Sequence, residues 1–232
     1  PAVWVSGFYG SGKTHLVKML RALWVDSTFE DGATARGIAN LPEKIKDRLI
    51  ELSTQGKRLG GLHAVSGTLG SGASGSVRLA LLGLIFKSVG LSEKYPVARF
   101  TMWLNGEGIY EKVREIVEQK GYNWQEELDN FQVAEGIYEA LCQLKPTIFS
   151  PSISAIEILP QLYPNVTDVS SDDMIKSIRQ ALSRNGMLPL TLIVLDEIQA
   201  FIGENSQRSE DVREAVEACC KNIGSKLLFI GT

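Results

Sequence analysis

The N-terminal segment contains the feature that most constrains the fold. The apolar run Ala2–Val5 precedes Gly7-Phe8-Tyr9-Gly10-Ser11-Gly12-Lys13-Thr14, and a segment of helical periodicity, His15–Trp24, follows directly. A strand, a glycine-rich turn and a helix in this order are the context in which a G-x-x-x-x-G-K-[ST] loop binds phosphate. The glycines let backbone N–H groups turn toward phosphate oxygens, and the start of the helix adds its positive end. The sequence therefore predicts an α/β fold with a phosphate-binding loop.

The side chains of this loop have distinct expected roles. Lys13 is expected to reach the β- and γ-phosphates of a nucleotide, and the Thr14 hydroxyl to ligate Mg²⁺. The positions expected to contact the nucleotide form one unbroken run, namely Gly7, Phe8, Tyr9, Gly10, Ser11, Gly12, Lys13, Thr14 and His15. The alternative is a glycine turn before an ordinary helix, which would bind no ligand.

A second motif lies near the C-terminal end of the sequence. The near-continuous apolar run Leu190–Leu195 is typical of a strand buried on both faces of a parallel sheet, and it ends in Asp196-Glu197. Ligands bind outside the carboxyl ends of such strands. Asp196 is therefore expected to hold Mg²⁺ together with Thr14, and Glu197 to orient and deprotonate the water that attacks the γ-phosphate. The alternative is a pair of charges that caps a strand end.

A further apolar run, Lys226–Ile230, ends in Gly231-Thr232. In P-loop ATPases with an additional strand, this strand lies between the other two and presents a polar side chain to the γ-phosphate. Thr232 occupies that place and is a candidate nucleotide contact. Arg208 is a candidate for contacting the site of a neighbouring subunit, with an ordinary surface role as the alternative.

Composition excludes several classes of function. The net charge of −3, from 24 basic and 27 acidic side chains, gives no reason to expect DNA or RNA contact on this chain. Cys142, Cys219 and Cys220 have no metal-binding spacing, which indicates reduced thiols in an intracellular compartment. No apolar run reaches the roughly 18 residues of a membrane span. Because the sequence begins and stops beside core-like runs, we expect it to be a fragment of a longer protein.

The remaining segments divide the chain into three parts. Strand signals fade between Leu91 and Val169, where helices are expected at 109–119, 124–128, 133–144 and 155–159. We expect a first part of the P-loop core at 1–90, an all-helical insertion at 91–169, and a second part of the core at 170–232. The last part contains the strand at 190–195 that ends in the two carboxylates (the Walker B strand). It also contains the strand at 226–230, which we call sensor-like because it would present Thr232 to the γ-phosphate. Four aromatic side chains are expected to pack the insertion, namely Trp103, Tyr110, Trp124 and Tyr138.

Three other features have structural interpretations that we favour over functional ones. His63, in a short strand at 62–65, is expected to be a hydrogen-bonded core or edge residue and not a catalytic one. The glycine-rich stretch 67–75 is expected to be a flexible connector, with a mobile loop near the nucleotide or a partner as the alternative. Asp172 and Asp173 are expected to lie in the first turn of a helix and not to form a metal site.

These motifs resemble those of the large P-loop ATPases of bacterial BREX phage-resistance systems, of the BrxC/PglY type. The matching stretches are Val3–Leu16 and Ile193–Gln199, with Val77–Leu82 and Ala98–Leu104 between them. The resemblance implies an AAA+-like architecture, ATP and Mg²⁺ as cofactors, and the bacterial cytoplasm. It also implies partners among other subunits of a phage-defence complex and possible homo-oligomerisation. The family's C-terminal lid and later sensor arginine are not in this sequence.

The expected function is Mg²⁺-dependent ATP hydrolysis that drives conformational change in a phage-defence complex. The main alternative is a nucleotide-dependent switch that binds ATP and rarely cleaves it. A kinase is disfavoured by the second carboxylate beside Asp196. A GTPase is disfavoured because the sequence has no Asn-Lys-x-Asp motif.

Overall fold

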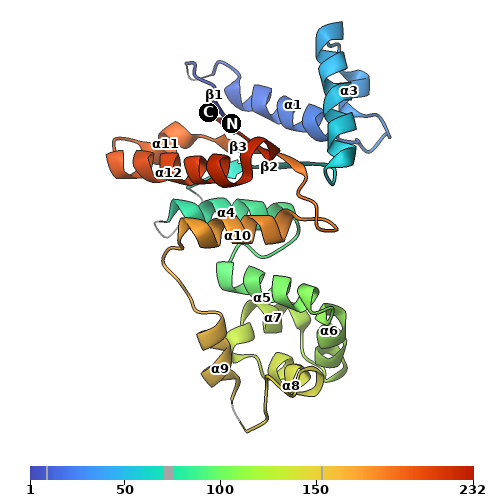
Figure 1. Cartoon of the computed structure of the whole chain (residues 1–232), viewed down its shortest axis with the longest axis vertical. Coiled ribbons are helices and arrows are strands. Elements are labelled where there is room, and N and C mark those ends of the chain that lie inside the picture. The colour runs from blue at the N-terminus through green and yellow to red at the C-terminus, as the bar shows by residue number, and fades with distance from the viewer. Residues whose placement is uncertain (9, 71–75, 153) are drawn as a thin grey trace. The chain divides into compact units, whose positions relative to one another are not determined.

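The chain divides into two compact units (Figure 1). The structure, a computed structural model, describes residues 1–8, 10–70, 76–152 and 154–232. The first unit combines Pro1–Val89 with Asp168–Thr232, and the second is Gly90–Thr167. The corresponding boundaries predicted from the sequence lie after residues 90 and 169.

The first unit is built on a four-stranded parallel sheet in the order β1-β4-β3-β2. The strands are β1 (Ala2–Trp4), β2 (Leu62–Thr68), β3 (Leu190–Asp196) and β4 (Leu227–Gly231). Because all the strands are parallel, their carboxyl ends meet at one edge, where Thr68 pairs with Asp196 and Leu195 with Gly231. Strand β4 lies between β1 and β3, as expected from the sequence.

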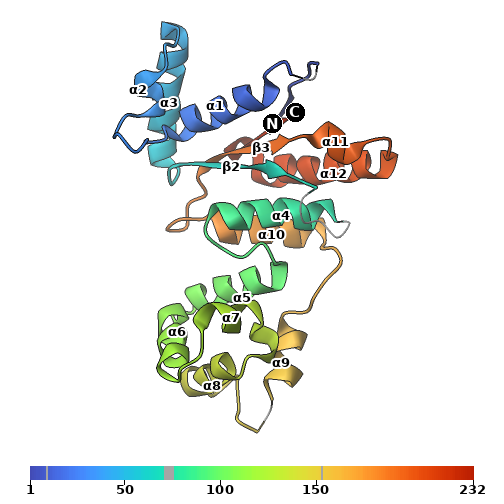
Figure 2. The ribbon, with the colours of Figure 1, turned by 180° about the vertical axis from the view of Figure 1, so that it is seen from behind.

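Helices cover both faces of this sheet (Figures 1 and 2). Helix α1 (Lys13–Val25) packs on one face, and α4 (Val77–Ser88) and α12 (Ser206–Ile223) pack on the other, with α10 (Ser171–Leu182) beside α4. The remaining helical segments of this unit are short or peripheral, namely α2 (Ala35–Ile38), α3 (Glu43–Arg58), α11 (Ile198–Ile202) and η2 (Gly224–Lys226). Residues 190–195 of β3 are all buried, which confirms the strand predicted to be covered on both faces.

Two local expectations about the sheet were wrong. The apolar run at 2–5 was expected to form a core strand, but β1 is an edge strand and leaves Val3 50% and Trp4 52% exposed. An edge strand has a neighbour on one side only, so its apolar side chains are less completely covered. Gly67 and Thr68 were assigned to the glycine-rich connector, but they belong to β2. Residues 71–75 of that stretch lie outside the described residues.

Every element described in the second unit is a helix. The bounds are α5 (Tyr95–Gly106), α6 (Tyr110–Gln119), α7 (Trp124–Asp129), η1 (Phe131–Val133), α8 (Glu135–Leu144) and α9 (Ala155–Leu162). No helix was predicted over α5. Its Pro96 lies in the first turn, where the missing N–H group leaves no intrahelical hydrogen bond unmade, so this proline starts a helix and does not break one.

Aromatic rings form the centre of the second unit. The Phe100 and Phe131 rings stack with centroids 4.4 Å apart, and Tyr163 presents an edge to both rings. Tyr138 is buried in the same cluster. The other three aromatic residues predicted to pack here are partly buried against the cluster, namely Trp103, Tyr110 and Trp124. The predicted packing role of these four side chains is therefore confirmed.

Replacing Phe100 with Ala should strongly destabilise the second unit. Phe100 has no exposed surface, so the substitution leaves a cavity, and we expect the free energy of opening to fall by about 3–5 kcal/mol. Native-state hydrogen exchange of the amides of α5, α6 and α8 measures this change. Val133→Ala is the control, because Val133 is 55% exposed and its truncation should change the same free energy by less than about 0.5 kcal/mol. Equal protection in the two variants would contradict the assigned core.

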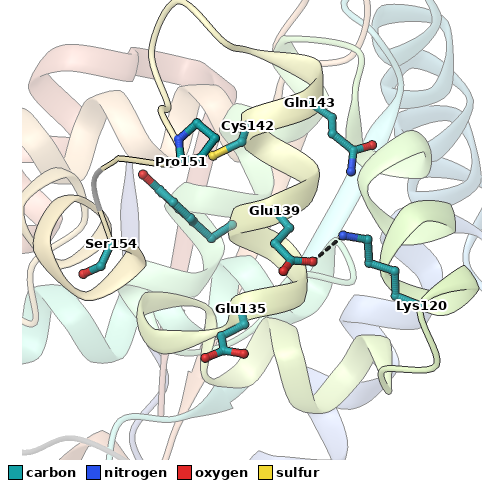
Figure 3. A pocket seen from close by; sticks show the side chains of 8 residues that line it. Lys120, Glu135, Glu139, Cys142, Gln143, Pro151 and Ser154 are labelled. Atoms are coloured by element: carbon teal, nitrogen blue, oxygen red, sulfur yellow. Dashed lines mark hydrogen bonds and ion pairs between the residues drawn. The ribbon is translucent and has the colours of Figure 1, made fainter.

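A cavity of about 520 Å³ lies in the second unit beside α8 (Figure 3). The Lys120 ammonium forms an ion pair with Glu139 at the wall of the cavity (Figure 3). The hydroxyl of Tyr138, a buried residue, donates to the Ser150 carbonyl at 2.9 Å. Cys142 also lines this cavity. Desolvation raises the pKa of the Cys142 thiol and of the Tyr138 phenol, so both groups stay protonated at neutral pH. Neither group is therefore an activated nucleophile.

His63 on β2 is a buried and fully bonded residue. The Ser88 hydroxyl donates its proton to the Ile85 carbonyl at 2.6 Å, so at 2.9 Å it accepts a hydrogen bond from His63 Nε2. His63 Nδ1 is then unprotonated and accepts from Arg184 at 3.3 Å. This neutral tautomer satisfies both ring nitrogens. Burial, with Arg184 and Arg21 nearby, lowers the pKa of His63 to about 4.

This lowered pKa makes stability depend on pH. The unfolded chain, in which His63 has its ordinary pKa of 6.5, takes up a proton before the folded chain does. The contribution of His63 is therefore complete above pH 6.5 and is lost as the pH falls toward about 4. We expect wild type to lose more free energy of unfolding between pH 7.5 and pH 5 than His63→Gln, whose amide can still donate to Ser88. Urea denaturation at both pH values measures this, and equal losses would contradict it.

Candidate functional site

The loop that precedes α1 has the backbone conformation that its glycines permit. Gly10 and Gly12 have φ angles of 79° and 83°, in the left-handed region that residues with a Cβ atom rarely adopt. Gly12 is the N-cap of α1, and no side chain caps this helix start. The first N–H groups of α1 are therefore available to an anion. Tyr9, also predicted as part of the loop, lies outside the described residues.

The Lys13 side chain folds back over the loop. Its ammonium donates to the carbonyl oxygens of Gly7 at 2.7 Å and of Phe8 at 3.0 Å. These bonds place a positive charge at the mouth of the loop. If a phosphate group bound there, the ammonium could donate to its oxygens in place of the two carbonyl oxygens. Phe8, also predicted for the site, is 92% exposed and is not among the described residues that line the cavity around this loop.

The acidic pair at the end of β3 meets this loop. Thr14 and Asp196 are 182 residues apart in sequence, yet the Thr14 hydroxyl donates to Asp196 Oδ1 at 3.2 Å. The pairing of β3 with β4 also brings Thr232 to this point, and its hydroxyl donates to the same oxygen at 2.5 Å. The loop, the acidic pair and the end of β4 therefore form one hydrogen-bonded cluster.

Glu197 follows Asp196 in an uncommon backbone conformation. Its φ of 57° is left-handed, which is uncommon for a residue other than glycine; Asp26 and Asn185 are the other such residues among those the structure describes. Its N–H group reaches Asp196 Oδ1 and the Thr232 hydroxyl, both at 3.1 Å. The Glu197 side chain is exposed, and among the described residues its carboxylate has no bonded partner. Among the described residues, no side chain therefore competes with a ligand for this carboxylate.

These residues line one cavity of about 840 Å³. Of the residues predicted for the site, the cavity is lined by Gly7, Gly10, Ser11, Gly12, Lys13, Thr14, His15, Asp196, Glu197 and Thr232. Sequence analysis missed Lys18, Gln199 and Ala200, which also line it. The position of Lys18, one helical turn after Thr14, was a usable signal, because such residues share a helix face. Gln199 ends the stretch Ile193–Gln199 that carries the resemblance but was given no role, and Ala200 belongs to no motif.

The other candidates from the sequence lie outside this cavity. The Arg208 guanidinium donates to the Phe201 carbonyl at 3.0 Å and stacks over the Phe201 ring. Asp172 and Asp173 lie in the first turn of α10, where the Ser170 hydroxyl accepts the Asp173 N–H at 3.1 Å. Their expected helix-start role is confirmed. The described part of the chain contains no group of three or more His, Cys, Asp or Glu side chains arranged to hold a metal.

Two further findings concern the cysteines and the length of the helices. In the described structure the three cysteines are free thiols, and desolvation raises the pKa of the buried Cys219 to about 12. Cys219 has no exposed surface and faces the core. Among residues 1–8, 10–70, 76–152 and 154–232, no helix is both long enough and apolar enough to cross a membrane.

No protein-family model and no solved structure matches the chain. Its function therefore has to be inferred from the residues of the site.

Proposed function

We propose that this chain is an ATP-binding domain of the additional-strand P-loop NTPase class that hydrolyses ATP with Mg²⁺. The observation that carries the proposal is the 3.2 Å bond between Thr14 and Asp196, which joins the glycine loop to the acidic pair in one cavity. Phosphate groups would lie against the loop N–H groups, the start of α1 and Lys13. Glu197 would orient the attacking water and accept its proton.

The residues present fit a magnesium ion. Mg²⁺ is commonly bound through one or two carboxylates together with the oxygens of substrate phosphates and water. Thr14 and Asp196 are the oxygen donors here. Asp196 Oδ1 accepts three hydrogen bonds, while Oδ2 has no bonded partner among the described residues and is left for the ion or its water. When bound, the ion would neutralise charge on the β- and γ-phosphates.

The order of the strands supports the same class. In additional-strand P-loop ATPases, the strand that follows the carboxylate strand in sequence lies between it and the loop strand. Here β4 lies between β3, which ends in Asp196, and β1, which precedes the loop. The fold and the site therefore favour one class of nucleotide-binding protein.

The cellular role that we propose rests on the sequence resemblance alone. The stretches Val3–Leu16 and Ile193–Gln199 resemble BREX phage-resistance ATPases of the BrxC/PglY type. We propose that ATP hydrolysis drives conformational change in a bacterial, cytoplasmic phage-defence complex. Other subunits of that complex, or further copies of the same chain, would then be the partners.

One observation favours a second candidate, a nucleotide-dependent switch with little intrinsic hydrolysis. No arginine is among the described residues that line the cavity, and Arg208 is bound to Phe201. P-loop enzymes that lack an arginine finger hydrolyse nucleotide slowly. Turnover by a single chain should therefore be slow, and a second chain would have to supply the missing positive charge.

Titration calorimetry combined with phosphate release tests the proposed function. We expect saturable heat with Mg-ATP, weaker heat with Mg-GTP, and slow release of inorganic phosphate. Heat without phosphate release in single-turnover conditions would favour the switch. The absence of heat with Mg-ATP on a folded sample would overturn both candidates.

A further inference from the structure

We infer that Thr232 is a positioning residue for the magnesium site and does not contact the γ-phosphate. This inference rests on the proposed function and gives Thr232 a role different from the sensor role expected from the sequence. In this role, Thr232 fixes the orientation of the Asp196 carboxylate and the backbone of Glu197.

The hydrogen bonds of the Thr232 hydroxyl carry the inference. A hydroxyl group has one proton to donate, and phosphate oxygens at neutral pH are acceptors. The Thr232 proton is committed to Asp196 Oδ1 at 2.5 Å, and a lone pair of the same hydroxyl accepts the Glu197 N–H at 3.1 Å. The hydroxyl therefore has no second proton to offer to a γ-phosphate.

The surroundings of Thr232 keep it in this arrangement. The residue is only 6% exposed. Its N–H group donates to the Leu195 carbonyl at 3.1 Å, and its carbonyl accepts the Ile198 N–H at 2.9 Å. These two backbone bonds lie on either side of the acidic pair. Thr232 therefore holds the turn in which Glu197 has its left-handed conformation.

The hydrogen bonds of Asp196 determine which of its two carboxylate oxygens would face the ion. Asp196 Oδ1 accepts bonds from Thr14, Thr232 and the Glu197 N–H group. Because these three bonds all go to Oδ1, Oδ2 is the oxygen that would hold the ion or its water. Without the Thr232 hydroxyl, the Asp196 carboxylate loses one of the three hydrogen bonds that fix its orientation. Its affinity for Mg²⁺ should therefore fall. The phosphate loop does not depend on this bond, so binding of ATP without Mg²⁺ should not change.

The test is a magnesium titration on Thr232→Val, which keeps the shape of the side chain and removes its hydroxyl. Binding of a fluorescent ATP analogue is measured in EDTA and at increasing Mg²⁺. We expect Thr232→Val to need about tenfold more Mg²⁺ for half-maximal enhancement of binding, the usual effect of losing a hydrogen bond to a charged group. Affinity in EDTA should match wild type, and Thr232→Ser should restore the wild-type Mg²⁺ requirement.

Two further measurements separate this role from a sensor or a merely structural one. In a double-mutant cycle, Thr232→Val should add little to the Mg²⁺ defect of Asp196→Asn, because both act through one carboxylate. Thr232→Ala replaces Thr232→Val if the latter does not fold, as judged by circular dichroism. The second measurement is the preference for ATP over ADP. If Thr232→Val keeps the wild-type Mg²⁺ requirement but loses this preference, Thr232 is a sensor of the γ-phosphate and the inference is overturned. A wild-type protein that binds ATP with no response to Mg²⁺ would instead contradict the proposed magnesium site itself.

Discussion

Replacing Glu197 with Gln is expected to lower phosphate release from ATP by about 10²- to 10⁴-fold, the usual contribution of a general base. Glutamine has the shape of glutamate, but its amide cannot accept the proton of water. The Glu197 side chain is exposed and its carboxylate is unpaired among the described residues, so the substitution should not disturb packing. Single-turnover hydrolysis measures the rate, and calorimetry should show Mg-ATP affinity within about twofold of wild type.

The matched control for this experiment is Glu204→Gln. Glu204 is an exposed carboxylate just beyond α11, and it is not among the residues that line the cavity. Both its hydrolysis rate and its affinity should equal those of wild type. If Glu197→Gln also hydrolyses ATP at the wild-type rate, Glu197 is not the base. If neither variant nor wild type releases phosphate, the switch is the better account.

Replacing Lys13 with Ala is expected to weaken Mg-ATP binding by about a hundredfold or more, since bonds between charged partners are among the strongest in a binding site. The present partners of the ammonium are two exposed backbone carbonyls, Gly7 and Phe8, which water can satisfy after its removal. Alanine also favours the helix that begins at this position. The variant should therefore fold normally and lose only its ligand.

Calorimetry on Lys13→Ala and on Lys44→Ala provides the comparison. Lys44 is an exposed lysine on α3 and does not line the cavity. Its replacement removes the same charge from the chain and should leave Mg-ATP affinity unchanged. Equal losses in the two variants would mean that net charge, and not the loop, determines binding. Equal affinity of wild type and Lys13→Ala would place the nucleotide elsewhere.

Features with a local physical cause were predictable from the sequence. A strand buried on both faces needs an unbroken apolar run, so 190–195 predicted β3 closely. A turn with left-handed positions favours glycine, and Gly10 and Gly12 have those conformations. The acidic residues were found because they follow a buried strand, and carboxyl ends of parallel strands share one edge.

Features that depend on distant partners were not predictable in this way. The exposure of Trp4 follows from the place of β1 at the edge of the sheet, and the chain order of the strands does not reveal it. The commitment of the Thr232 proton to Asp196 depends on the register between β3 and β4. The left-handed Glu197 has no signature in its residue type. A sequence pattern shows which residues could act, but not which partners they have.

A crystal structure of the protein with Mg²⁺ and a non-hydrolysable ATP analogue tests the central claim most directly. The account predicts one ion about 2.0–2.1 Å from Thr14 Oγ1, with Asp196 bound to it directly or through water. It also predicts Lys13 on the β- and γ-phosphates of the same nucleotide. A nucleotide bound outside this cavity, or one that contacts Lys13 while the ion lies away from Asp196, would contradict the account.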